Sequence, residues 1–339
     1  MITGFGRLFF AGDRPGPVDT TPMTQTVAIT GATGFIGRAI TRQLILAGYR
    51  VRALIRSTRL ADSLSARGVE PVPGSLEDHA SLESLIHGAD VLVHCAGAVR
   101  GATQEHFDRV NVEGLIRLLR VMESHDAPPR LLSLSSLAAR EPRLSFYAAS
   151  KFKGEQVLVN DGHRVAWDVL RPPAVYGPGD KEMLPLFRAM ARGIAPVPGS
   201  SYARFSLVFV EDLASAVIHW IQSGQASHRI YTLDDGHEGG YDWHGVAVIV
   251  ERICRRRVRL LPLPAWVLDV PAYLNRQASR VFGYAPMLTP EKLHELRHTD
   301  WICDHSALEA ATGWRPQVQL EEGLRRTPGW PGYAGRAAV

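Results

Sequence analysis

Residues 26–48 read TVAITGATGFIGRAITRQLILAG, in which an apolar run leads into a cluster of glycines and then into a helical pattern. This order predicts a dinucleotide site, because such glycines allow a tight turn and a close approach of the backbone to a pyrophosphate. Amides at the start of the helix would face the same anion. The residues predicted to bind the cofactor in this stretch are Gly31, Thr33, Gly34, Phe35, Ile36 and Gly37.

Outward from this stretch, short β-rich runs alternate with helical ones as far as residue 172. Such alternation predicts a parallel sheet. Several strands are almost wholly apolar, so we expect an α/β fold whose doubly wound parallel sheet, of the Rossmann type, has helices on both faces. The expected strands are 26–30, 49–55, 69–73, 90–95, 130–136 and 166–172, and the expected helices are 35–48, 79–88, 107–124 and 149–159.

The chain is predicted to divide into four segments. An N-terminal extension, 1–24, precedes the dinucleotide-binding Rossmann domain, 25–178, and residues 331–339 form a tail. Between them, a smaller C-terminal α/β lobe, 179–330, covers the substrate, and some of its elements return to the Rossmann sheet. Because the first strand pattern starts only after them, we expect residues 1–22 to be dispensable for folding and cofactor binding.

Two features of the C-terminal lobe allow more than one interpretation. The stretch RRRVRLLPLPAWVLDVPAYL (255–274) mixes basic residues with aromatic and aliphatic ones, which suits a membrane-surface contact or a strand followed by a buried helix. We expect the buried helix. Four side chains of this lobe are candidates for a substrate pocket, although packing or surface positions suit them equally: Tyr202, Arg204, Phe205 and Trp243.

Composition excludes several classes of protein. A net charge of +4 is too small to require nucleic acid as a partner. The three cysteines lie far apart without CxxC spacing, which favours a reducing, cytoplasmic location, and the 13 histidines show no metal-ligand spacing, so no metal is expected. No apolar run approaches the roughly 20 residues of a membrane-spanning helix, so no integral span is expected.

Tyr147 and Lys151 are four residues apart, a spacing that places both side chains on one face of a helix. A tyrosine hydroxyl has a pKa of about 10, so a nearby positive charge is needed to favour its phenolate at neutral pH. Lys151 is the candidate for that charge. Taken alone, such a pair is more often a surface pair, but its position after a strand that ends in Ser135-Ser136 favours catalysis.

Four motifs together resemble the extended short-chain dehydrogenase/reductase family, nearest its 3β-hydroxysteroid dehydrogenase and dihydroflavonol reductase branch. They are TGATGFIG at 30–37, HCAG at 94–97, NVEG at 111–114 and RPPAVYGPG at 171–179. The resemblance implies that Tyr147 is the catalytic acid and base, that Lys151 also bonds the nicotinamide ribose, and that Ser136 bonds the substrate oxygen. It gives Asn111 a role in a proton relay or a backbone bend. It adds cofactor contacts at Ser75, Leu76, Ala96, Gly97, Pro172 and Val175.

The choice of cofactor depends on the end of the second strand. A site that prefers NAD usually has an acidic residue about 20 positions after the first glycine, where it bonds the ribose 2′-hydroxyl. Here Arg56 and Arg59 stand in that region, and a guanidinium suits a 2′-phosphate. NADP(H) is therefore favoured over NAD, unless both arginines are ordinary surface charges.

The resemblance leaves the reaction open among redox, epimerisation and dehydration. Nucleotide-sugar enzymes of the family carry R-x-x-N before V-Y-G, whereas residues 171–174 here read RPPA, and Leu137, Ala138 and Ala139 stand where dehydratases add an acidic pair. We therefore expect NADP(H)-dependent interconversion of a ketone and an alcohol on a small, mainly apolar substrate. The alternatives are a nucleotide-sugar epimerase or dehydratase and a non-enzymatic NADP(H)-binding sensor or assembly protein. Related enzymes often form homodimers through a four-helix contact, which is an expectation by analogy here.

Overall fold

The computed structural model describes residues 25–334. The predicted extension, 1–24, lies outside the described residues, and so do residues 335–339 of the predicted tail. The expectation that residues 1–22 are dispensable therefore concerns a segment outside the described part of the chain.

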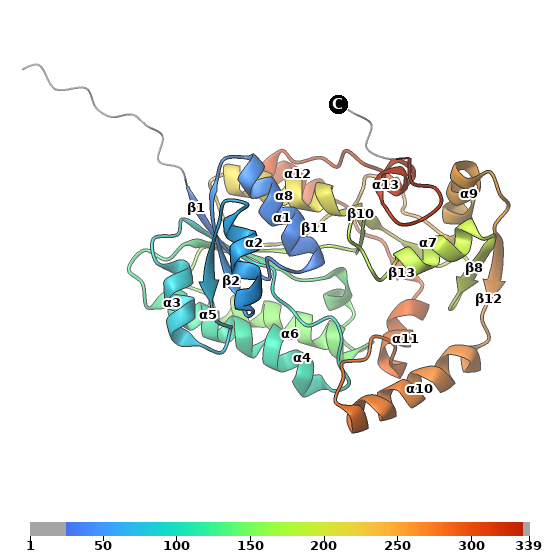
Figure 1. The fold of residues 1–339 in the computed structure, drawn as a ribbon, viewed down its shortest axis with the longest axis horizontal. Coiled ribbons are helices and arrows are strands. Elements are labelled where there is room, and N and C mark those ends of the chain that lie inside the picture. The colour runs from blue at the N-terminus through green and yellow to red at the C-terminus, as the bar shows by residue number, and fades with distance from the viewer. Residues whose placement is uncertain (1–24, 335–339) are drawn as a thin grey trace, which may run out of the picture.

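A parallel sheet of seven strands forms the centre of the molecule, and six of its strands lie in the predicted runs 26–30 to 166–172, while the seventh comes from the C-terminal lobe (Figure 1). In spatial order they are β11 (Ile230–Thr232), β6 (Trp167–Arg171), β5 (Arg130–Leu134), β4 (Val91–His94), β1 (Thr26–Thr30), β2 (Arg50–Ile55) and β3 (Val69–Pro73). The chain leaves β1 toward β2 and β3, then crosses back to β4, so the strand order reverses between β1 and β4. Ligands of open α/β sheets bind at such a reversal, outside the carboxyl ends of the strands.

Helices cover both faces of the sheet, because the strand side chains are apolar on both sides. One face packs on α1 (Phe35–Leu46), α8 (Val210–Gln222) and α12 (Ser306–Thr312). The other packs on α3 (His79–Ile86), α5 (Glu113–Glu123) and α6 (Phe146–Asp161). The predicted doubly wound α/β fold is confirmed.

Two helices differ from the predicted ranges at places that matter for the site. The single helix expected over 107–124 is two helices, α4 (Gln104–Asn111) and α5, which meet at Val112. Helix α6 begins three residues before its predicted start, because the Ser145 side chain caps it by accepting a hydrogen bond from the amide of Ala148 at 2.9 Å. That cap places Tyr147 in the first turn.

The part of the chain after residue 179 contributes to two bodies of structure. Strand β11 pairs with β6, and α8 packs on α1, so these elements belong to the main sheet. Other elements form a separate core that contains Phe187, Phe209 and Trp330. Its helices are α7 (Leu184–Ala191), α9 (Trp243–Cys254) and α13 (Leu320–Arg326), while α10 (Ala265–Phe282) and α11 (Pro290–Arg297) contribute no residue to it. The short parallel strand pairs are β7 (Ala174–Tyr176), from just before residue 179, with β10 (Leu207–Phe209), β8 (Ile194–Val197) with β12 (Arg259–Pro262), and β9 (Arg204–Phe205) with β13 (Asp300–Trp301).

Helix α10 corrects one expectation. Residues 255–274 were expected to form a strand and a buried helix, and they do form β12 and the first part of α10. However, α10 buries only Ala272 and Ser279 and leaves most of its bulky apolar side chains exposed. The expected burial is wrong, because α10 packs on α11 through a narrow face of small residues and turns its wide apolar face outward.

Candidate active site

The turn between β1 and α1 leaves no room for a side chain at two of its glycines. Gly31 has a φ of +74°, and a Cβ there would lie 2.6 Å from the backbone nitrogen of Ala96. A Cβ on Gly37 would lie 2.0 Å from the carbonyl oxygen of Gly31. Real Cβ atoms do not approach other atoms so closely, so the turn requires glycine at both positions.

The N-terminus of α1 opens beside this turn without a capping side chain. Its N-cap is Gly34, no side chain accepts a hydrogen bond from the first amides, and the first turn contains no acidic residue. Such free amides and the helix dipole attract an anion. Thr33 is exposed just before the helix, while Phe35 and Ile36 are partly buried in its first turn. The turn and helix start therefore fit a dinucleotide pyrophosphate.

Arg56 and Arg59 lie beyond the carboxyl end of β2, the same end of the sheet as the glycine turn. Arg56 directly follows the strand, and Arg59 lies in the 3₁₀ helix η1 (Thr58–Leu60) just before α2 (Ala61–Ser65). Both side chains are exposed, and neither guanidinium pairs with another residue in the part of the chain that the structure describes. Both are free to meet a phosphate.

Ser75 and Leu76 occupy the turn after β3. The Ser75 hydroxyl accepts a hydrogen bond from the amide of Glu77 at 3.2 Å, which shapes the turn. Leu76 lies against α5, where a Cβ on Gly114 would approach its Cδ1 atom to 2.9 Å. Both residues are partly buried at the same end of the sheet as the glycine turn.

Ala96 and Gly97 follow β4 and meet the glycine turn from the neighbouring strand. The Ala96 amide donates a hydrogen bond to Thr30 Oγ1 at 3.2 Å. A Cβ on Gly97 would lie 3.0 Å from Lys151 Nζ and 3.1 Å from Asn111 Oδ1. This loop therefore joins the glycine turn to the helix that carries the predicted catalytic pair.

Ser136 and Tyr147 come together although ten residues separate them in the sequence. Ser136 caps the 3₁₀ helix η2 (Leu137–Arg140), where its hydroxyl accepts a hydrogen bond from the Ala138 amide at 3.2 Å. Burial raises the pKa of Tyr147 to about 12, a hydrogen bond with Ser136 acts to lower that pKa, and the nearby charge of Glu295 raises it. The Tyr147 hydroxyl is therefore protonated at neutral pH.

Lys151 lies one turn after Tyr147 on α6 and reaches the end of β5. Its Nζ atom donates a hydrogen bond to the carbonyl oxygen of Leu134 at 2.9 Å. Burial lowers the pKa of Lys151, while Cys95 and Glu155 act to raise it. The ammonium thus lies beside Gly97, between the strand ends and the helix.

Asn111 is buried and uses its whole amide to hold the loop after β4 against α6. Its Nδ2 atom donates to the Ala98 carbonyl oxygen at 3.0 Å and to the Ser150 hydroxyl at 2.9 Å, and its Oδ1 atom accepts from the Ala98 amide at 2.7 Å. These contacts suit the support of backbone geometry, one of the two roles that the resemblance implied.

Pro172 and Val175 lie after β6. The Pro172 carbonyl oxygen accepts a hydrogen bond from the Leu137 amide at 2.8 Å, which ties this segment to the turn that carries Ser136. Val175 is partly buried in β7 and packs against the core of the main sheet. Both predicted residues therefore lie near the strand ends, with Pro172 in direct contact with the predicted catalytic turn.

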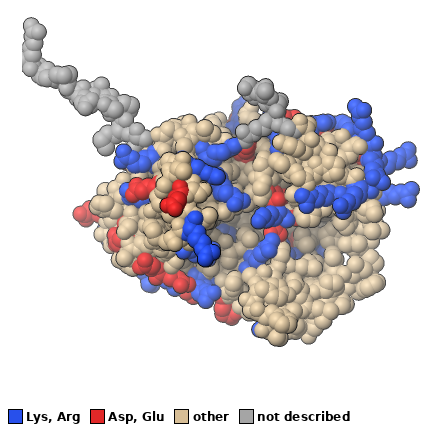
Figure 2. All heavy atoms as spheres, in the orientation of Figure 1, with Lys and Arg blue, Asp and Glu red and all other residues tan. Residues whose placement is uncertain are grey.

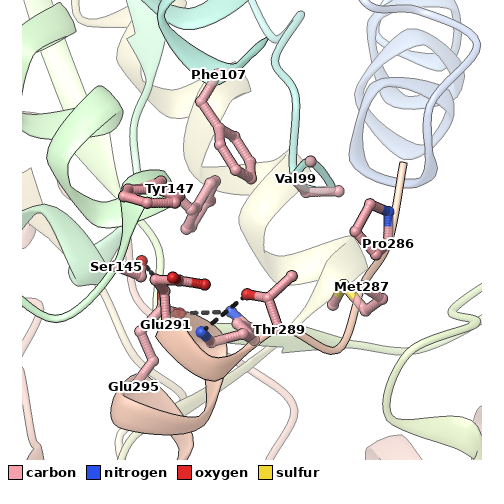
Figure 3. A pocket seen from close by; sticks show the side chains of 12 residues that line it. Val99, Phe107, Ser145, Tyr147, Pro286, Met287, Thr289, Glu291 and Glu295 are labelled. Carbon is pink, nitrogen blue, oxygen red and sulfur yellow. Dashed lines mark hydrogen bonds and ion pairs between the residues drawn. The ribbon is translucent and has the colours of Figure 1, made fainter. Parts of the chain in front are cut away.

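A pocket next to Tyr147 brings in residues that sequence reasoning missed. Its walls include Val99, Phe107 and Met287, and α11 contributes Lys292 and Glu295 (Figure 3). The buried Glu295 carboxylate accepts hydrogen bonds from Ser145 and Lys292, and the ammonium of Lys292 lies 5.3 Å from the centre of the Tyr147 ring. No local pattern distinguishes Lys292 and Glu295 from an ordinary ion pair on a helix surface.

The four candidate pocket residues of the C-terminal lobe lie elsewhere. Tyr202 is 74% exposed and stacks on His244, and the ring of Phe205 packs on Trp243 with 5.4 Å between centres. Arg204 donates a hydrogen bond to the Gly239 carbonyl oxygen. None of the four lines the pocket beside Tyr147.

Two absences hold for residues 25–334. In that range, no group of three or more His, Cys, Asp or Glu side chains is arranged to bind a metal ion. Across the same range, every helix is too short or too polar to traverse a bilayer.

Comparisons with known proteins agree with this geometry. The model of the NAD dependent epimerase/dehydratase family matches residues 27–233. The chain is 36% identical over 317 residues to a ceramide reductase of Caulobacter vibrioides, covering 91% of this chain and 95% of that protein. It is 24% identical over 335 residues to a UDP-glucose 4-epimerase of Vibrio cholerae, covering 90% and 95%.

A solved structure of UDP-glucose 4-epimerase from Bifidobacterium longum superposes with a TM-score of 0.66 at 19% identity, covering 89% of this chain and 96% of that one, which supports the fold. The family match spans the glycine turn, Ser136 and the Tyr147–Lys151 pair, so the resemblance inferred from the motifs is confirmed. The chain therefore belongs to the NAD dependent epimerase/dehydratase family and is an NAD(P)-dependent oxidoreductase of the extended short-chain dehydrogenase/reductase type.

Proposed function

We propose that this enzyme uses NADP(H) to interconvert a ketone and an alcohol on a mainly apolar, lipid-like substrate. The observation that carries the proposal is the position of Tyr147, which hydrogen-bonds with Ser136 and forms part of a pocket with apolar walls at Val99, Phe107 and Met287. The similarity to a ceramide reductase along almost the whole chain supports a reductase with a lipid substrate.

The chemistry divides between the cofactor and the side chains. When bound, the nicotinamide supplies the hydride for the carbonyl carbon. Tyr147 donates its proton to the carbonyl oxygen during reduction and takes it back during oxidation, while Ser136 donates a hydrogen bond to the same oxygen. Lys151 holds the nicotinamide ribose and favours the phenolate form of Tyr147, with which it shares one face of α6.

A substrate panel tests this proposal. We expect loss of NADPH absorbance with ketones of increasing chain length, including a keto form of ceramide, and faster turnover for the more apolar ones. UDP-glucose serves as the control, because residues 171–174 lack the asparagine of nucleotide-sugar enzymes. Epimerisation of UDP-glucose, or tight NADPH binding without turnover of any carbonyl compound, would contradict the proposal.

Arg56 is proposed to set the preference for NADP(H), with Arg59 beside it. Wild-type protein should bind NADPH more tightly than NADH, and Arg56→Ala should narrow the difference, because only the phosphorylated cofactor offers a charge-assisted contact, worth about 1.5–3 kcal/mol or roughly 10- to 100-fold. Calorimetric titration with both cofactors measures this. Arg67→Ala, an exposed arginine farther along the chain, is the control. Equal affinities in the wild type would refute the assignment.

Glu295 is expected to influence the pH dependence of oxidation, because Tyr147 must lose its proton before it can accept one from an alcohol. The oxidation rate should therefore rise with pH toward the Tyr147 pKa. Glu295→Gln removes a negative charge that raises this pKa, so the rise should begin at lower pH. Glu291→Gln is the control, since Glu291 lines the same pocket but pairs with Arg276. A pH–rate profile for oxidation that is unchanged in Glu295→Gln would show that Glu295 has no such effect.

A further inference from the structure

Helix α10 presents a largely apolar face to solvent, interrupted by Gln277. At 100° per residue, Trp266, Val270, Tyr273, Leu274 and Val281 fall within about a third of the helix circumference. Each of these side chains is at least 51% exposed, and Phe282 at the end of the helix is 78% exposed. The buried residues of the helix, Ala272 and Ser279, lie on the opposite side. Single exposed apolar residues are ordinary, but a contiguous patch of this kind marks an interaction site.

The helix and the segment that leads into it are strongly basic. Residues 255–284 contain six arginines and one acidic residue, Asp269, which is paired with Arg297 at 2.7 Å. Arg276 is paired with Glu291. The other five arginines are exposed and have no ion pair or side-chain hydrogen bond within residues 25–334; they are Arg255, Arg256, Arg257, Arg259 and Arg280.

The two features adjoin each other on one side of the molecule. Figure 2 shows basic side chains projecting near β12, beside a surface over α10 that is almost free of charged residues. Only two residues, Leu263 and Pro264, connect the end of β12 at Pro262 to the start of α10 at Ala265. An apolar helix face that includes Trp and Tyr, with arginines beside it, is the composition of a helix that lies in the interface of a membrane.

We propose that the α10 face docks this enzyme on the surface of an anionic lipid bilayer. The apolar side chains would enter the boundary between headgroups and acyl chains, and the unpaired arginines would contact lipid phosphates. Charge complementarity selects this partner, because a second copy of the chain would bring the same unpaired arginines face to face. Docking of this kind does not depend on which carbonyl compound the enzyme reduces.

The docked face would lie close to the active site. Pro286 and Met287 line the pocket beside Tyr147 and follow Phe282 by four and five residues. At no more than about 3.6 Å per residue, the chain places Pro286 within roughly 14 Å of the end of α10. An apolar substrate leaving the bilayer would therefore have a short path to the pocket.

Vesicle sedimentation with the full chain tests the proposal. Wild-type protein should bind vesicles of phosphatidylcholine with phosphatidylglycerol, bind phosphatidylcholine alone much more weakly, and dissociate as salt is raised. Replacing Arg255, Arg256, Arg257 and Arg259 by serine should weaken binding by roughly 600-fold, since each arginine at an anionic surface contributes about fivefold. The variant Trp266→Ser/Leu274→Ser/Phe282→Ser should weaken it by roughly tenfold or more, through loss of buried apolar area.

Matched variants on other surfaces serve as controls. Arg67, Arg120, Arg143 and Arg164 are exposed arginines elsewhere, and Leu46 is a 72% exposed leucine at the end of α1. Their serine variants should bind vesicles like the wild type, and circular dichroism should show that all variants are folded. The proposal is overturned if wild-type protein fails to bind anionic vesicles or if the α10 and arginine variants bind as well as the controls. Loss of dimer in the α10 variant, together with no vesicle binding by the wild type, would identify the face as a contact between copies.

Discussion

Turnover of Tyr147→Phe should fall by roughly 10²- to 10⁴-fold while NADPH affinity stays close to that of the wild type. The substitution removes the hydroxyl that transfers the proton but keeps the ring. The packing of the ring against Phe107 and its contact with the Lys292 ammonium therefore remain. Single-turnover rates with the best ketone and titration with NADPH measure the two quantities.

Lys151→Ala is the informative comparison for this variant. Lys151 is proposed to act both on Tyr147 and on the nicotinamide ribose, so its removal should reduce turnover and NADPH affinity together. A non-enzymatic sensor would have no turnover to lose, and its NADPH affinity would not depend on Tyr147. Wild-type turnover in Tyr147→Phe would therefore exclude the proposed mechanism.

Gly37→Ala should lower NADPH affinity by roughly 10- to 100-fold, the loss expected when one charge-assisted hydrogen bond between the helix amides and the pyrophosphate is broken. A Cβ at this position would stand 2.0 Å from the Gly31 carbonyl oxygen, so the start of α1 would have to move away from the turn by more than 1 Å to reach ordinary contact distance. The free amides of α1 would then no longer face the pyrophosphate together with the turn. Titration with NADPH measures the loss.

Gly245→Ala is the matched control, because Gly245 occupies the same position relative to its N-cap, three residues after Asp242, at the start of α9. A Cβ there would meet only the Asp242 side chain, at 3.3 Å. This variant should keep its NADPH affinity. Thermal melts of both variants separate loss of the site from loss of the fold, since overpacking at Gly37 should cost about 1–3 kcal/mol of stability. If Gly37→Ala kept the NADPH affinity of the wild type, the glycine turn would not be part of the cofactor site.

The predicted cofactor and catalytic residues came from short sequence patterns, and the structure around each pattern is formed by residues close together in the chain. The spacing of Gly31, Gly34 and Gly37 matches a strand, a turn and a helix, and the four-residue spacing of Tyr147 and Lys151 places both on α6. The parallel sheet then brings the carboxyl ends of its strands β1 to β6 to one edge, where the remaining predicted residues lie. Such patterns can be recognised in a sequence because they depend only on a few backbone angles and on the helical repeat.

Other features depended on contacts between distant segments. Glu295 is 148 positions from Tyr147, and its charge reaches the phenol only because α11 contacts the start of α6, where Ser145 donates a hydrogen bond to Glu295. The break between α4 and α5 at Val112 was hidden, because both helices carry helical periodicity and together appeared as one. The four candidate pocket residues of the C-terminal lobe do not line the pocket beside Tyr147, and no local pattern in the sequence showed which side chains would.

The sequence by itself determined the doubly wound sheet, the glycine turn and the helix that carries Tyr147 and Lys151, because hydrophobic period and glycine position act within a few residues. Only the tertiary structure decided which residues line the pocket beside Tyr147. It also decided that the apolar face of α10 is exposed to solvent. Amphipathic spacing shows that a helix has an apolar face, but whether that face meets a protein core or solvent depends on the arrangement of all other elements. Helix α10, expected to be buried, is therefore the surface that the structure alone could reveal.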